Sequence, residues 1–145
     1  MDGPVEGRVE QEISWLLDRA RIRELTARYN RCFDDGDPDG YADTFTEDGV
    51  MEVAGGPSTS GRNDLAEMCR KIPWGVMHVT VDATVDVDGD SAKQHVALVV
   101  IRRAGRPQDK PQITSTGRYE DDLVRTPDGW RFARRRCTLD GWVEK

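Results

Sequence analysis

The sequence is poor in histidine and in cysteine, and these shortages exclude several kinds of site. Its 145 residues include two histidines and three cysteines. The cysteines, Cys32, Cys69 and Cys137, are odd in number and lack a CxxC pair. That pattern is typical of reduced structural thiols in a cytoplasmic protein, not of a disulfide scaffold. It also argues against a zinc site.

Long apolar runs and excess positive charge are missing too. No apolar stretch approaches the roughly 20 residues that cross a bilayer. Residues 1–6 have neither a basic nor an apolar region, so we expect no secretory signal. The net charge is −6, which disfavours binding to nucleic acid or anionic membrane by bulk electrostatics. We therefore expect a cytoplasmic protein with neither of these partners.

What is present predicts one domain over residues 1–145, with a flexible polar leader over residues 1–8. Helical spacing of apolar residues, including Ile13, Leu16 and Leu17, predicts a long helix with one stripe on the core. Residues 55–61 are rich in Gly, Pro and Ser and favour a loop without regular structure. The predicted helices are 10–33, 38–45 and 62–71.

From about residue 78 the apolar period changes from helical to alternating, and DG turns separate the runs. Helices followed by meandering antiparallel strands make an α+β domain, and a curved sheet would leave a pocket against the helices. The predicted strands are 50–53, 78–87, 94–102, 112–123 and 130–138.

Regular alternation along 78–87 has an awkward consequence. It places Asp82 and Asp86 on the same face as His78. Charges on that face would resist a dry pocket. A bulge after His78 would resolve the conflict, but the sequence cannot show one.

His78 and Asp34 are the residues most suited to catalysis, if the fold brings them together. A carboxylate paired with an imidazole is common machinery for moving protons near neutral pH. A structural histidine is the competing interpretation. Asp34 also belongs to an acidic cluster, although Asp37 is the better helix cap because it directly precedes Pro38.

Several short motifs occur in an order that carries a family resemblance. They are Tyr29-x4-Asp34-x2-Asp37, Phe45-Thr46-Glu47-Asp48-Gly49, His78-Val79-Thr80, Gly117-Arg118-Tyr119 and Asp128-Gly129-Trp130-Arg131-Phe132. From about residue 13 to 143 the chain resembles the SnoaL-like branch of the nuclear transport factor 2-like superfamily. The resemblance implies a single SnoaL-like domain: a curved antiparallel sheet and three N-terminal helices forming a cone around a pocket.

The resemblance to the dehydratases of this family also implies a chemistry. Asp34 and His78 match the catalytic pair, and Tyr29 would polarise a carbonyl or hydrogen-bond an enolate. The implied activity is a lyase that eliminates water from a small hydroxylated carbonyl or polyketide-like substrate. It needs no metal or organic cofactor, and a homodimer is expected.

The family resemblance and the alternation of the last strand predict the substrate-binding residues. The family's arginine on the last strand falls near Arg134, Arg135 and Arg136, and alternation with Trp130 and Phe132 favours Arg134 or Arg136 facing inward. We expect the substrate to contact Trp74, Met51, Val53, Ile101 and Arg136.

Two other functions stay open. One is a SnoaL-like cyclase or isomerase acting on a polyketide or steroid-like substrate. The other is a non-catalytic ligand-binding or assembly subunit. An enzyme should show a closed apolar pocket at the pair, whereas an assembly subunit should fill that space with side chains. Epoxide hydrolysis is disfavoured, because the strand positions for its two aspartates and arginine read as apolar.

Overall fold

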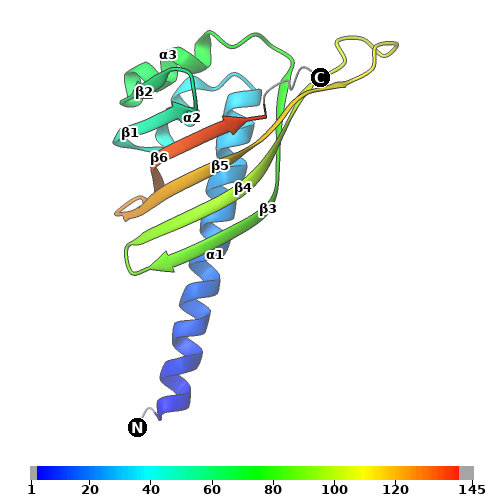
Figure 1. The fold of residues 1–145 in the computed structure, drawn as a ribbon. Helices are drawn as coiled ribbons and strands as arrows, with labels where there is room; N and C mark the ends of the chain where they lie inside the picture. The colour runs from blue at the N-terminus through cyan, green and yellow to red at the C-terminus, as the bar shows by residue number, and fades with distance from the viewer. Residues whose placement is uncertain (1–2, 141–145) are drawn as a thin grey trace.

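The computed structural model describes residues 3–140, which form one curved sheet with helices on its concave side and at one end (Figure 1). No helix in this part of the chain is long and apolar enough to cross a bilayer. The elements are α1 Pro4–Asp34, α2 Pro38–Asp43, β1 Phe45–Val53, β2 Ser58–Ser60, α3 Arg62–Arg70, β3 Val76–Asp88, β4 Ser91–Arg102, β5 Gln112–Thr126 and β6 Gly129–Leu139.

The sheet has the order β2-β1-β6-β5-β4-β3. Every neighbouring pair is antiparallel except β1 and β6, which run parallel. The predicted α+β class and cone-shaped fold are therefore confirmed. The prediction for 55–61 was wrong, because Ser58–Ser60 pairs with Glu52–Val50 and extends the sheet by a short edge strand.

Aromatic rings fill the space between α1 and the sheet. Tyr29 from α1 packs against Tyr41, Phe45, Tyr119 and Phe132, with ring centroids 4.9–6.0 Å apart. All five side chains are buried. Large aromatic side chains contribute much of the apolar area that a small core can bury, and here they occupy the interior of the cone.

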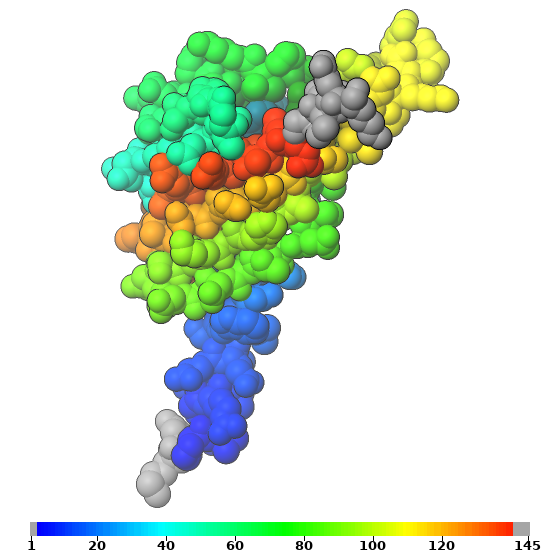
Figure 2. All heavy atoms as spheres, in the orientation of Figure 1, coloured from blue at the N-terminus to red at the C-terminus, as the bar shows by residue number. Residues whose placement is uncertain are grey.

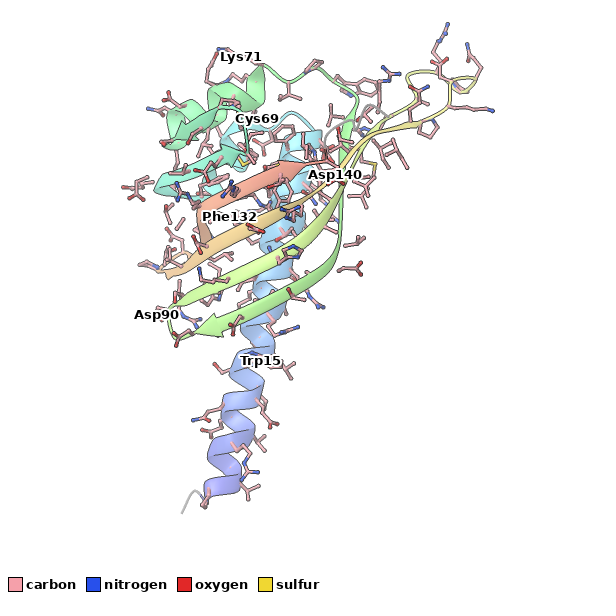
Figure 3. All side chains as sticks on the ribbon, viewed as in Figure 1. Trp15, Cys69, Lys71, Asp90, Phe132 and Asp140 are labelled. Carbon is pink, nitrogen blue, oxygen red and sulfur yellow. The ribbon has the colours of Figure 1, made fainter. Side chains whose placement is uncertain are left out.

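Helix α1 runs well beyond the sheet (Figures 1 and 2). It begins at Pro4, and proline suits the first helical position. The prediction of a flexible leader was therefore wrong for residues 4–8, which are helical. The prediction that one apolar stripe of this helix packs on the core is also wrong for the first half of the helix. The exposed apolar side chains there are Val5, Val9, Ile13, Trp15, Leu16 and Leu17. Trp15 marks the region in Figure 3.

Strand β3 contains the bulge that the charge pattern required. Its register against β4 shifts by one residue between Val81 and Thr84, and Asp82 adopts a φ of 55°. The bulge leaves His78 and Val85 facing inward, while Val81 and Asp86 are exposed. Regular alternation from 79 to 87 was therefore wrong, because one extra residue reverses the faces.

A second register shift lies in β6. Asp122 pairs with Arg134 but Leu123 pairs with Phe132, so Ala133 is the extra residue. The alternation that starts at Phe132 consequently slips by one position. Arg135 turns inward, and Arg136 is exposed on the outer face of the sheet. The expectation that Arg134 or Arg136 points inward was wrong for this reason.

Candidate functional site

The last residue of α1 and the third residue of β3 form a close pair. Asp34 Oδ1 lies 2.6 Å from His78 Nδ1, and the His78 backbone N–H donates to Asp34 Oδ2 at 2.9 Å. Their side chains are 11% and 9% exposed. One carboxylate thus holds both the ring and the backbone of His78. Because Nδ1 is engaged, Nε2 is the ring nitrogen left without a hydrogen bond among residues 3–140.

Arg103 fixes the end of the helix that carries Asp34. Its Nη2 donates to the Asp34 carbonyl at 2.9 Å, and its backbone N–H donates to Gly75 O at 2.7 Å. A cation at a helix C-terminus interacts favourably with the helix dipole. The guanidinium also lies 5.5 Å from the centre of the Trp74 ring. Sequence reasoning missed Arg103, because an arginine just past the end of a strand, next to Arg102, carries no distinguishing pattern.

Tyr29 lies deeper than the pair. Its hydroxyl accepts a hydrogen bond from Tyr41 at 3.4 Å and points toward Met51 Sδ at 3.8 Å. Burial raises the pKa of Tyr29, although the charge of Arg135 opposes the rise. The Phe33 ring contacts both Tyr29 and His78, with centroid distances of 6.3 and 4.5 Å. Within residues 3–140, no hydrogen bond joins Tyr29 to the pair.

A second aspartate, Asp121, forms a buried ion pair with Arg135 in the core. Arg135 Nε donates to Asp121 Oδ1 at 2.8 Å and Nη2 donates to Oδ2 at 3.1 Å. The guanidinium stacks on Tyr119, Tyr29 and Phe132 at 3.7, 4.3 and 4.3 Å. Burial alone would lower the pKa of Arg135, but the Asp121 carboxylate and the neighbouring tyrosines outweigh it and raise the pKa.

Gln94 links this core pair to α1. Its Nε2 donates to Asp121 Oδ2 and to Thr26 Oγ1, both at 2.9 Å. The Thr26 hydroxyl in turn donates to Ile22 O at 3.1 Å. Sequence analysis also missed Asp121, although its alternation with the apolar Tyr119 and Leu123 could have marked it as inward-facing.

A groove of about 520 Å³ lies between α1, β3 and β4, and neither Asp34 nor His78 lines it. Asn30 and Thr80 both line it and are joined by a 3.0 Å hydrogen bond from Asn30 Nδ2. We call this hollow the α1–β3 groove. Its lining residues are Arg23, Thr26, Ala27, Asn30, Thr80, Val81, Asp82, Ala83, Gln94 and Val96.

Comparison with known proteins identifies the family. The SnoaL-like domain matches residues 14–136. The chain belongs to the SnoaL-like family. An uncharacterized protein of Mycobacterium tuberculosis, Rv2910c, is 30% identical over 85% of this chain and 86% of its own. Members of this SnoaL-like, nuclear transport factor 2-like superfamily include polyketide cyclases and dehydratases.

Solved structures of similar fold agree with this SnoaL-like assignment. A nuclear transport factor 2-like protein with a cystatin-like fold from Novosphingobium aromaticivorans aligns with a TM-score of 0.85 and 31% identity, over 98% of this chain and 94% of its own. A candidate scytalone dehydratase from the same organism aligns at 0.75 and 22% identity, over 87% and 86%. At that lower identity the likeness concerns the fold alone.

The five residues expected to contact substrate are spread across this SnoaL-like domain. Met51 is buried beside Tyr29, and Val53 and Ile101 are half-buried. Trp74 is 73% exposed. Arg136 lies on the outer face, and Arg135 is the member of the arginine triplet that faces inward. Substrate contacts of all five stay a prediction.

The interior of the SnoaL-like cone matches the arrangement set out above for an assembly subunit better than the one for an enzyme. It is filled by aromatic rings, and the α1–β3 groove is lined by polar as well as apolar residues, without Asp34 or His78 among them. The reason given against epoxide hydrolysis was wrong in part, since Asp121 and Arg135 do face inward. Arg135 and Gln94 nevertheless donate three hydrogen bonds to Asp121, and the fully buried carboxylate is closed to water from solvent.

Proposed function

We propose that this protein is a cofactor-independent dehydratase acting on a small hydroxylated carbonyl or polyketide-like compound. One observation carries the proposal: the Asp34 carboxylate binds both Nδ1 and the backbone N–H of His78 and leaves Nε2 available. That arrangement fixes the ring position and favours the tautomer in which Nε2 accepts a proton.

The reaction would run through one base. His78 Nε2 removes a proton from the carbon next to the substrate carbonyl, giving an enolate. Asp34 stabilises the imidazolium that forms. The imidazolium then returns the proton to the β-hydroxyl as its C–O bond breaks, releasing water and leaving a conjugated double bond. Positioned proton transfer of this kind contributes about 10²–10⁴-fold to the rate.

Tyr29 enters the proposal as a hydroxyl donor to the substrate carbonyl. The raised pKa keeps this phenol protonated at neutral pH, as a donor requires. Because Phe33 contacts both Tyr29 and His78, a substrate reaches the two together only when the Phe33 ring turns aside. Isomerisation or ring closure would begin with the same proton abstraction.

The filled interior favours a second candidate, a subunit that binds ligand or assembles without catalysis. In that case the Asp34–His78 pair would fasten the end of α1 to the edge strand β3. Substrates would then bind without turnover. A homodimer remains part of either proposal, and light scattering of the purified chain tests it.

A turnover screen separates the two candidates. β-Hydroxy carbonyl compounds are incubated with the wild-type protein and with Asp34→Asn, His78→Asn and Asp35→Asn, and loss of water is followed by mass spectrometry. Asp35 is the matched control, since it is the next residue and is exposed. We expect activity in wild type and Asp35→Asn, and at least about a 100-fold loss in the other two. Equal activity in Asp34→Asn would refute the mechanism.

A further inference from the structure

The first half of α1 exposes a row of apolar side chains to solvent. Figures 1 and 2 show this half of the helix extending away from the sheet. Val9, Ile13 and Leu16 are 47%, 51% and 57% exposed, and Ala20 is exposed as well. Single exposed apolar residues are ordinary, but a contiguous row of them usually marks a surface that another molecule covers.

This row lies on the side of α1 that points away from the sheet. Val9, Ile13 and Leu16 each precede a buried residue of the same helix by nine positions, or about 2.5 turns at 3.6 residues per turn. The buried residues are Asp18, Ile22 and Leu25. The extra half turn puts the two sets on opposite sides of the helix. The exposed row is therefore no continuation of the core, and a partner can reach it without meeting the sheet.

The spacing along the row is that of a seam between two helices. Steps of three and four residues alternate strictly from residue 6 to residue 23, as the a and d positions of a coiled coil do. The series is symmetric about a point between residues 14 and 15, so it matches a copy of itself that runs the opposite way. We call its six residues the α1 seam: Glu6, Val9, Ile13, Leu16, Ala20 and Arg23.

The two ends of the α1 seam carry opposite charges on exposed side chains, Glu6 at one end and Arg23 at the other. An antiparallel second copy sets Glu6 against Arg23 at both ends, with Ile13 against Leu16 in the middle. A parallel copy would set like charges against each other. Complementary charges fix the orientation of an interface and disfavour wrong partners. Glu10 also lies close to the seam, and acidic residues there disfavour an anionic membrane.

The rest of the domain leaves room for such a partner. In the antiparallel arrangement residues 4–12 of the second copy lie beside residues 17–25 of the first. Ala20, Arg23 and Glu24 are exposed on that stretch. The sheet is attached on the other side, where Asp18 binds Arg125 and Ile22 is buried. The two sheets then lie on opposite sides of the helix pair.

We propose that the α1 seam joins two copies of this chain as an antiparallel helix pair. The apolar centre of the seam is buried between the copies, and the Glu6 and Arg23 charges pair at its two ends. The Asp34–His78 pair lies beyond the last turn of the overlap and stays outside the interface. The proposal goes beyond the proposed function and does not depend on it, since an enzyme and an assembly subunit can both dimerise in this way.

Sedimentation equilibrium of the full chain tests the interface without a substrate. We expect wild-type dimers with a micromolar dissociation constant, because the contact is confined to one helix of each copy. Ile13→Glu brings a carboxylate from both copies to the centre of the seam and should weaken the dimer at least about 10-fold. Ile113→Glu is the matched control, since Ile113 is 70% exposed but lies on β5, outside the seam. It should leave the dissociation constant unchanged.

Reversing the end charges tests the direction of the two helices. Glu6→Arg and Arg23→Glu each set like charges against each other in an antiparallel pair and should each weaken the dimer about 3-fold or more. The double variant restores opposite charges and should return to within about 2-fold of wild type. A parallel pair opposes like charges in all these proteins, so dimers that neither single variant weakens would overturn the antiparallel arrangement.

Three other results would also overturn the proposal. One is a wild-type protein that stays monomeric at millimolar concentration. Another is a dimer that Ile13→Glu leaves intact, because that dimer would be joined through a different surface. The third is a monomer that cosediments with vesicles of anionic phospholipid and loses this binding in Ile13→Glu, which would assign the exposed row to a membrane surface. Circular dichroism of each variant shows whether the fold is kept, as we expect for these exposed positions.

Discussion

Asp121 and Asp34 each use both carboxylate oxygens to hold one basic residue, but in different surroundings. Asp121 and Arg135 are fully buried, and their charges are enclosed by aromatic rings and Gln94. Asp34 and His78 lie where α1 ends against the edge strand β3, and both side chains keep some exposure. The first pair is closed to solvent, whereas in the second His78 Nε2 forms no hydrogen bond within residues 3–140.

The difference shows that a carboxylate–base pair alone does not indicate a reactive site. An arginine holds its proton at any ordinary pH, so Arg135 can position groups but cannot exchange protons. An imidazole can give as well as take a proton, and His78 Nε2 has no hydrogen-bond partner in the part of the chain that the structure describes. We therefore infer that the core pair specifies the fold and that the edge pair is available for chemistry.

Removing the core cation should have the largest effect on stability. Arg135→Met leaves the Asp121 charge buried without its partner, so we expect a loss of about 3–5 kcal/mol in the free energy of unfolding by urea. Arg136→Met, at the exposed neighbouring position, should change it by less than about 0.5 kcal/mol. A double variant with Asp121→Leu should recover much of the loss. Equal effects at 135 and 136 would contradict the comparison.

Removing the charge of Asp34 from the Asp34–His78 pair should cost less stability than Arg135→Met does. Asp34→Asn weakens charge-assisted hydrogen bonds to the ring and backbone of His78, worth about 1.5–3 kcal/mol. The loss is measured by the same urea titration, alongside the activity screen. A cost in stability as large as that of Arg135→Met would mean that the edge pair is mainly structural.

The ion pair of Asp18 and Arg125 joins a buried carboxylate to a partly exposed cation. Asp18 is 6% exposed and accepts from both Nη1 and Nη2 of Arg125 at 2.7 and 2.9 Å, while the Arg125 side chain is 35% exposed. The hydrogen bond from Arg125 lowers the pKa of Asp18, against the opposing effect of burial. The pair therefore stabilises the protein above about pH 4, the unfolded value, and the contribution is lost as pH falls through the lower folded value.

Thermal unfolding between pH 7 and 2 measures this dependence. Asp18→Asn should lose about 1–2 kcal/mol at pH 7 and show a flatter loss of stability below pH 4 than wild type. Asp122→Asn is the control, because Asp122 pairs with the exposed Lys93. An acid profile in Asp18→Asn that parallels wild type would show that other carboxylates carry the dependence.

Local signals predicted much of the fold. Helical spacing, DG turns and the Asp37–Pro38 start gave the order of the elements, and Asp37 does cap α2 by accepting from Gly40 N. What failed depends on distant partners. Nothing in the pattern of α1 says that its first half extends past the sheet. The inward position of Arg135 follows from the extra residue Ala133, which only the register with β5 defines.

The bulge in β3 should give the smallest change in stability, although it sets which side chains of the strand face inward. Asp82 occupies φ 55°, where glycine has no steric penalty, so Asp82→Gly should be neutral or stabilising by up to about 1 kcal/mol. Asp86→Gly, at an exposed position of the same strand, should cost about 0.5–1 kcal/mol, because glycine only adds backbone entropy there. Urea unfolding of the two variants gives the difference. If Asp82→Gly costs as much as Asp86→Gly, residue 82 does not adopt the left-handed conformation. The inward placement of both His78 and Val85 would then need another explanation, because without the extra residue their odd spacing would put them on opposite faces.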